Sequence, residues 1–138
     1  MNARIKLLIA TSTAVLALSC SGTRKATLQP GSSTPAAQGS VEAKQGDNGN
    51  TRVKVGVQHL APPQSVATGA STYVVWATPT TSGSEPQNLG ALMIGDDRKG
   101  ELSTVTPLRN FAITVTPEVS AKVQRPSNDP VLSAKIAQ

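Results

Sequence analysis

The feature that most restricts the fold is an alternation of apolar and polar residues that recurs from residue 53 onward. Successive side chains of a β-strand point to opposite faces, so a period of two predicts strands with one buried face. Two more continuously apolar segments, "TYVVWAT" (72–78) and "LGALMIG" (89–95), predict strands covered on both faces. The apolar members of the alternating segments are Val53, Val55 and Val57; Phe111, Ile113 and Val115; and Leu132, Ala134 and Ile136.

The segments between these runs are rich in turn-forming residues. "PTTSGSEPQ", "GDDRKG" and "RPSNDP" combine Gly, Pro, Ser, Asn and Asp. We expect Asp97 to Gly100 to turn a hairpin between Ile94 and Leu102. No segment after residue 52 offers ten residues of helical period without Pro or Gly. The sequence therefore predicts an all-β fold, a small antiparallel Ig-like β-sandwich of six or seven strands over residues 52–138.

The start of the chain predicts a signal peptide over residues 1–19. Arg4 and Lys6 precede "LLIATSTAVLALS" (7–19), which carries no charge. This run is shorter than the roughly 20 residues that span a hydrocarbon core. It ends at Cys20, the only cysteine, so no disulfide within the chain is expected.

The sequence "LALSC" (16–20) resembles the lipobox of bacterial lipoproteins. The resemblance implies that Cys20 is diacylated and becomes the first residue, which anchors the protein to a membrane of the cell envelope. The alternative is a buried or free cysteine at the end of an apolar helix. Ser21 stands where an Asp is the familiar signal for retention in the inner membrane, so the resemblance favours the outer membrane, on its periplasmic or surface face, if the organism has one.

Residues 20–51 predict a flexible linker. They are rich in Ser, Thr, Gly, Pro, Gln and Asn, and Leu28 and Val41 are the only larger aliphatic residues. Such a segment buries too little apolar surface of its own to offset its ordering entropy. A flexible chain of this length has a root-mean-square span of roughly 30 Å.

The charge pattern argues against nucleic acid as a partner. Without residues 1–19 the chain keeps 11 basic and 8 acidic residues, a net charge of +3. The basic residues are scattered, whereas nucleic-acid binding needs a basic face or stripe. Only two basic pairs are adjacent: Arg24-Lys25, which lies near enough to the anchor to touch anionic headgroups, and Arg98-Lys99, which suits a solvated turn.

Candidate catalytic and metal-binding residues are few. His59 is the sole histidine, and no G-x-S-x-G motif marks a nucleophilic serine. Asp96, Asp97 and Glu101 are the closest acids, but a Ca²⁺ site needs six to eight oxygens, and the segment also contains Arg98 and Lys99. A solvated turn accounts for them better. We expect no catalytic residue, no metal site and no cofactor, and therefore no enzyme.

Tyr73 and Trp76 are the remaining candidates, because exposed aromatic residues dominate many interfaces. Three positions apart in a strand, they should face opposite sides. We expect Trp76 in the core and Tyr73 half covered or in a small surface patch.

The order of motifs from residue 53 onward resembles the extracytoplasmic C-terminal domain of anti-sigma-K factors (RskA-type). That family has a Y-x-x-W strand, a Gly-containing strand, an F-x-I-T-V strand and a final P-x-x-P-V-L strand in this order. The resemblance implies a β-sandwich with a sensory or interaction role. The matching residues are Tyr73, Trp76, Gly90, Phe111, Ile113, Val115, Pro126, Pro130 and Leu132.

Two departures limit what the resemblance implies. The chain shows no cytoplasmic sigma-binding region and no second apolar span, and "EVSAKVQRPSN" (118–128) lacks the Gly-Gly that the family usually carries there. We therefore expect a lipid-anchored, non-catalytic binding module of the envelope that contacts the membrane and other envelope proteins. The alternative is an accessory sensory domain that acts with a membrane-bound anti-sigma factor.

Overall fold

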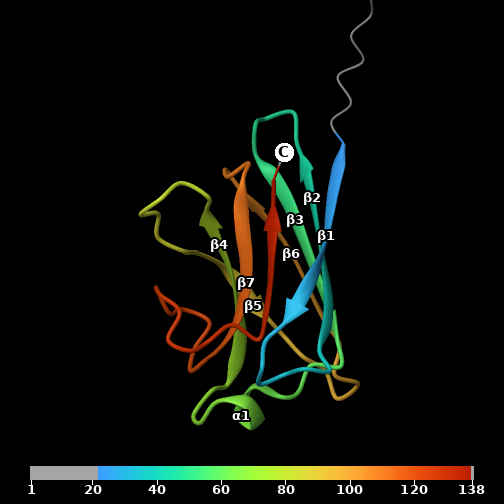
Figure 1. Cartoon of the computed structure of the whole chain (residues 1–138), viewed down its shortest axis with the longest axis vertical. Coiled ribbons are helices and arrows are strands. Elements are labelled where there is room, and N and C mark those ends of the chain that lie inside the picture. Colours follow the sequence, from blue (N-terminus) through green and yellow to red (C-terminus); the bar gives the residue numbers. More distant parts are fainter. Residues whose placement is uncertain (1–21, 138) are drawn as a thin grey trace, which may run out of the picture.

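The computed structural model describes residues 22–137, so the predicted signal peptide (1–19) and Cys20 lie outside the described residues. The described part consists of eight strands and one short helix (Figure 1). Their bounds are β1 (Thr23–Pro30), β2 (Gln38–Gln45), β3 (Thr51–Gln58), α1 (Pro63–Val66), β4 (Thr72–Pro79), β5 (Gln87–Leu92), β6 (Gly100–Thr106), β7 (Phe111–Glu118) and β8 (Leu132–Ile136).

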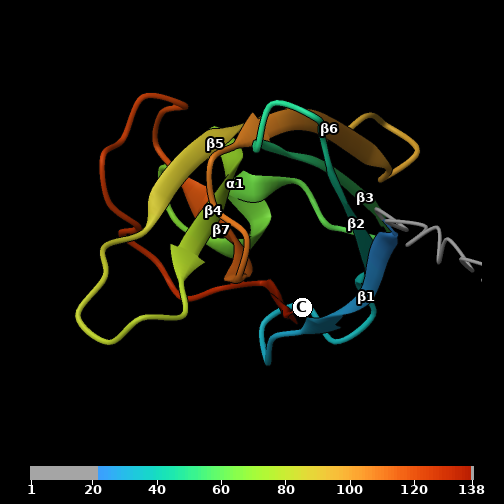
Figure 2. The ribbon, with the colours of Figure 1, turned by 90° about the horizontal axis from the view of Figure 1, so that it is seen from above.

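The strands form one antiparallel sheet in the order β5-β4-β7-β8-β1-β2-β3-β6. Strand β1 joins its two halves, because Thr23 to Leu28 pair with β2 whereas Gln29 and Pro30 pair with β8. The sheet curves until its edge strands, β5 and β6, contact one another, which gives a nearly closed, sandwich-like arrangement (Figure 2). The all-β fold is thus confirmed, with eight strands instead of six or seven.

The predicted linker is wrong over residues 23–45, which form β1 and β2. Strand β2 pairs with β3 along its whole length, from Gln38 opposite Gln58 to Gln45 opposite Thr51. Leu28, Val41 and Ala43 are fully buried or nearly so, while their neighbours face solvent. The segment is ordered because β3 and β8 supply backbone partners and most of the apolar surface that it lacks. The domain therefore begins at about residue 23 and not at residue 52.

The core lies between the two halves of the sheet. The three alternating segments are confirmed, since their apolar residues form the inward faces of β3, β7 and β8. The continuous run 72–78 is the central strand β4, covered on both faces as expected. The run 89–95 is different: β5 is an edge strand that ends at Leu92, and Met93 is 74% exposed. The largest buried side chains of the core are Tyr73, Phe111, Leu28, Leu60, Leu92, Ile113 and Leu132.

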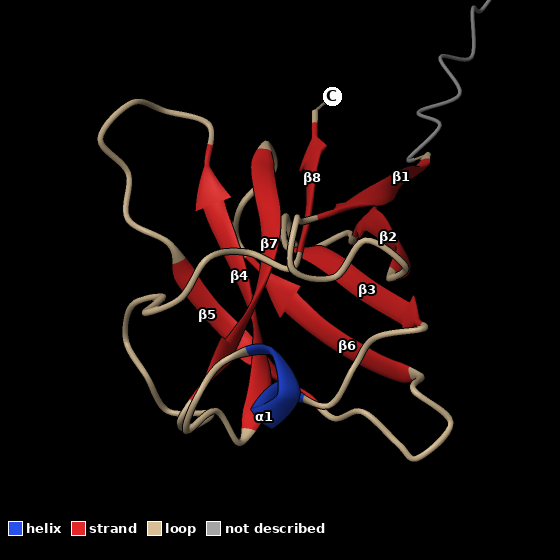
Figure 3. Cartoon of the chain, turned by 60° about the horizontal axis from the view of Figure 1, so that its bottom comes forward, coloured by secondary structure: helices blue, strands red, loops and turns tan. Residues whose placement is uncertain are grey.

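The turn expected at 97–100 is present, but it does not join a paired hairpin. The Gly95 N–H donates to the Lys99 carbonyl at 3.0 Å, and Arg98 adopts a positive φ of 60°. The two strands that the turn connects are the opposite edges of the sheet order. Helix α1 lies at this same end of the molecule, away from the start of β1 (Figure 3).

Candidate functional site

A groove of about 910 Å³ lies where β1 ends, β2 begins and β6 begins. Its floor is a row of outward-facing positions that the strand register aligns: Thr27 opposite Ser40, Ser40 opposite Gly56, and Gly56 opposite Glu101. Gly56 deepens the groove because it has no side chain. A Cβ atom at this position would have only Ser40 Oγ near it, at 4.0 Å, so the space above Gly56 is open. The groove is thus a property of the sheet surface, opened by one missing side chain.

The segment 31–37 forms one wall of the groove, and it is held firmly to the sheet. The buried Thr34 hydroxyl donates to the Val131 carbonyl at 2.9 Å, and the Gly31 N–H donates to the same carbonyl at 2.8 Å. Pro35 and Ala36 of this segment line the groove. The wall is therefore preformed.

Polar and apolar groups share the rest of the lining, and the polar ones include the side chains of Gln38, Gln58, Lys99 and Glu101. The Gln58 amide donates to the Gln38 side chain at 2.9 Å, and Glu101 forms an exposed ion pair at 3.2 Å with Lys54, which lies outside the lining. No aromatic side chain lines the groove, since the three aromatic residues, Tyr73, Trp76 and Phe111, are fully buried. The groove suits a ligand that hydrogen-bonds, and it offers no surface for stacking a sugar ring or a base.

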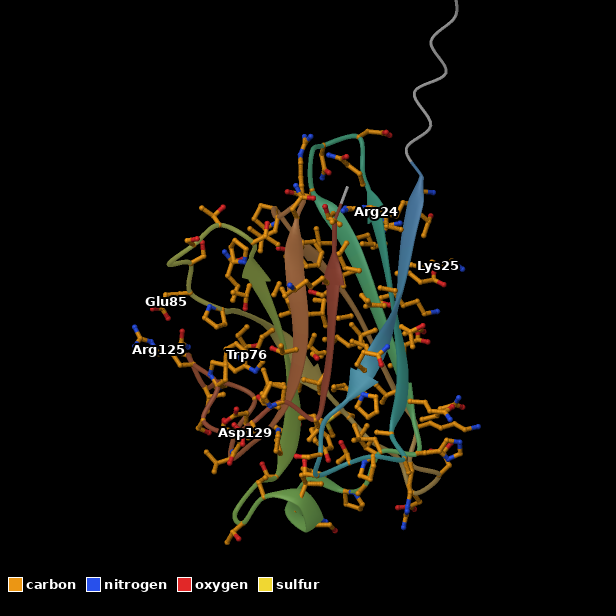
Figure 4. The ribbon with its side chains drawn as sticks, in the orientation of Figure 1. Arg24, Lys25, Trp76, Glu85, Arg125 and Asp129 are labelled. Atoms are coloured by element: carbon orange, nitrogen blue, oxygen red, sulfur yellow. The ribbon has the colours of Figure 1, made fainter. Side chains whose placement is uncertain are left out.

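A second candidate is the buried polar chain around Trp76, on the face of β4 and β7 that points away from the core. The Trp76 indole donates to Thr116 Oγ1 at 2.8 Å, and the Thr116 hydroxyl donates to Glu118 Oε1 at 2.7 Å. Glu118 also accepts from the Ser127 N–H at 2.9 Å and from the Ser127 hydroxyl. Glu118 has no exposed surface. Figure 4 shows Trp76 beside the segment that follows β7.

The segment 119–130 is held over this face by further hydrogen bonds. Asn128 donates to the Pro117 carbonyl at 2.7 Å. From the neighbouring strand, the Asn88 amide donates to the carbonyls of Ala121 at 3.0 Å and Val123 at 2.8 Å. Each of these bonds ties the segment to β5 or β7, so the buried carboxylate of Glu118 acts as a structural clamp. Sequence reasoning missed it, because the alternation along β7 places Glu118 on an exposed face.

Tyr73 and Trp76 face opposite sides as expected, and both are fully buried. Tyr73 belongs to the core, and its hydroxyl donates to the Ala61 carbonyl at 2.7 Å. Burial raises the pKa of Tyr73 to about 12. Trp76 lies outside the core cluster and is buried on the other face of the sheet, where its indole bonds to Thr116. The expectation of a half-covered Tyr73 is therefore wrong, because α1 and its flanking loop close over this end of the core.

The other expected residues lie at the surface. His59 directly follows β3 with a φ of 56° and is exposed. Asp97 accepts from the Lys99 N–H at 3.2 Å within the exposed turn. Among residues 22–137, no group of three His, Cys, Asp or Glu side chains is placed to hold a metal ion.

Within residues 22–137 there is also no helix with the length and apolar character needed to cross a membrane. No protein-family model matches the chain, and neither a curated protein nor a solved structure shows significant similarity to it. The resemblance to anti-sigma-K factors therefore remains an expectation from the motif order alone.

Proposed function

We propose that the chain is a lipid-anchored protein of the bacterial envelope whose β-sandwich is a non-catalytic binding module. The observation that carries the binding role is the preformed groove across Thr27, Ser40, Gly56 and Glu101. The lipobox-like "LALSC" supports the anchor at Cys20. By the same resemblance, the protein belongs to the outer membrane if the organism has one.

The groove favours a polar, extended ligand such as a peptide segment of an envelope protein or of the cell wall. Its amides and hydroxyls, with the charged side chains of Lys99 and Glu101, offer both donors and acceptors. A preformed wall lowers the ordering cost of binding. The absence of aromatic side chains from the lining disfavours glycan strands and nucleic acids.

The anchor is tested by growing cells with an alkyne-labelled fatty acid and recovering the protein. We expect label on the wild-type chain and on Ser21→Ala, and none on Cys20→Ala. Two or more acyl chains hold a protein stably at a bilayer, so the wild-type chain should also remain in the membrane fraction. An unlabelled wild-type chain would refute the lipoprotein assignment.

The groove is tested by titrating the isotope-labelled domain with soluble peptidoglycan peptides, glycan fragments and peptides from an envelope digest. We expect peptide fractions to move the amide signals of Ser40, Gly56 and Gln58. Gly56→Leu should weaken this binding at least tenfold, because its side chain fills the floor. Ser103→Leu, on the same face of β6 but outside the groove, is the matched control and should bind normally. Equal binding by both variants would refute the groove as the ligand site.

The regulatory alternative, an accessory domain acting with an anti-sigma factor, depends on pairing at a sheet edge. The two edge strands, β5 and β6, contact each other, which leaves less free edge than an open sandwich has. No feature of residues 22–137 favours this alternative over the binding module.

A further inference from the structure

The end of the molecule where β1 begins collects positive charge. It is formed by the start of β1, the β2–β3 turn (46–50) and the β6–β7 connection (107–110), and lies at the top of Figure 1. Arg24, Lys44, Arg52 and Arg109 lie here, with Asp47 as the acid of the turn. None of the four cations belongs to an ion pair among the described residues.

Two residues further along the strands from this end, positive and negative side chains alternate across the outer face of β1, β2 and β3. Lys25 lies opposite Glu42, and Glu42 lies opposite Lys54. Lys25 and Glu42 are 2.8 Å apart, and the hydrogen bond from Lys25, together with its charge and that of Lys54, holds the pKa of Glu42 below its usual value. Because Lys54 is also paired with Glu101, this part of the face is electrically balanced.

The row at the end of the sheet lacks this balance. Lys44 lies directly opposite Arg52, with Thr23 on one side and Val105 on the other. Like charges opposite each other on one face of a sheet destabilise it. An anion between the two side chains would remove that repulsion.

The same two cations line a hollow of about 540 Å³ beside the β2–β3 turn. The turn contributes Asp47 and Asn48 to the lining, and Val105 closes the other side. Val105 is 55% exposed, and it is one of only three large apolar side chains that are exposed in the described residues. The hollow thus combines two cations and one acid, Asp47, with one exposed apolar side chain, and a cationic surface beside an apolar side chain suits the boundary between headgroups and acyl chains.

Two arginines extend the basic surface inward from the hollow. Arg24 donates through Nη1 to the carbonyl of Arg109 at 2.8 Å, while its Nη2 is buried without a hydrogen-bond partner. The buried hydroxyl of Thr51, which opens β3 at this end, also lacks a partner. One buried guanidinium nitrogen and one buried hydroxyl are therefore unpaired at this end.

The chain places this end next to the proposed anchor. Thr23 opens β1 only three residues after Cys20, and three extended residues span at most about 10 Å. A lipid on Cys20 would hold the basic end against the headgroups. The row of Ser40 and Gly56 in the groove lies four residues further along β2 and β3, about 13 Å away.

We propose that this basic end docks on anionic phospholipid headgroups, with a headgroup phosphate between Lys44 and Arg52. Docking fixes the orientation of the domain, with the groove turned away from the bilayer. The inference deepens the proposed function and rests on its lipid anchor for orientation, but the headgroup contact itself can be measured without the lipid.

The test uses residues 20–138 with Cys20→Ala, because residues 22–137 contain all eight strands and the whole core. Binding is measured by flotation with vesicles of phosphatidylcholine, alone or mixed with phosphatidylglycerol. We expect binding only to the mixed vesicles, and its loss at high salt. Lys44→Gln with Arg52→Gln should weaken binding about 30-fold, from about 1 kcal/mol for each cation near a charged surface. Arg98→Gln with Lys99→Gln, at the opposite end, changes the net charge equally and should bind as the parent does.

Three results would overturn the docking surface: no binding to the mixed vesicles, equal binding to phosphatidylcholine alone, or equal losses in the two double variants. Shifts of the Lys44 and Arg52 signals by soluble glycerophosphate without vesicle binding would also overturn it. Failure of the fatty-acid labelling would leave these results untouched, so the anchor and the headgroup contact are judged separately.

Discussion

The indole of Trp76 donates to the hydroxyl of Thr116 at 2.8 Å on the side of the sheet that faces away from the core. Thr116 passes the hydrogen bond on to Glu118, and Glu118 accepts from Ser127 in the covering segment. A buried carboxylate is stable only when its oxygens are satisfied. The covering segment and the carboxylate therefore depend on each other.

Replacing the carboxylate should destabilise the fold strongly. Glu118→Ala leaves Thr116 and Ser127 without their acceptor, and we expect a loss of about 3 to 5 kcal/mol in the free energy of unfolding. Urea denaturation measures the loss. Glu101→Ala, which removes an exposed ion pair with Lys54, should cost less than about 1 kcal/mol. Similar costs for both variants would contradict the role of Glu118.

The fluorescence of Trp76 should report whether segment 119–130 is seated. Trp76 is the sole tryptophan and is fully buried, so the native protein should emit at short wavelength. Asn128→Ala removes the bond to the Pro117 carbonyl and should shift the emission to longer wavelength before global unfolding. An emission maximum that moves only with the loss of all β-structure would contradict a separately loosened segment.

The ionisation of Tyr73, the only tyrosine, should be delayed in the folded protein. Its pKa is raised to about 12 by burial, against about 10 in an unfolded chain. The neutral form is favoured on folding, so its contribution to stability is complete below about pH 10 and is lost as the pH rises through 12. Ultraviolet titration of the native and the urea-unfolded chain should separate the two values. A native transition near pH 10 would show that Tyr73 is accessible.

The place of β1 in the sheet can be tested with two adjacent residues. Leu28 is buried in the core and Thr27 is exposed. Leu28→Ala should cost about 2 to 5 kcal/mol, whereas Thr27→Ala should change stability by about 0.5 kcal/mol or less. If residues 20–51 were a tether, neither substitution would alter the melting temperature.

The strands from residue 53 onward could be predicted because their own side chains carry the alternation. The alternation of Val53, Val55 and Val57 predicts β3 from the sequence of that strand alone. Strands β1 and β2 could not be predicted in this way, since their inward positions hold Ala26, Gly39 and Ala43 beside Leu28 and Val41. Their order comes from backbone pairing with β3 and β8, which are distant in sequence.

The candidate site could be predicted from the sequence even less than β1 and β2. The groove depends on the register that sets Gly56 between Ser40 and Glu101, and register is a property of paired strands. Glu118 looks exposed by alternation and is buried only because the chain folds back over it. The surface positions of His59 and Asp97 agree with the sequence, since both lie in short segments rich in turn residues.

The pairing of Gln29 and Pro30 with β8 has a consequence for the order of events in folding. The first strand reaches its second partner only after about a hundred further residues have become available, so the contact that unites the two halves has nearly the largest sequence separation in the chain. Such long-range pairings form slowly. A nascent chain would therefore keep its N-terminal strand incompletely paired until synthesis has passed β8.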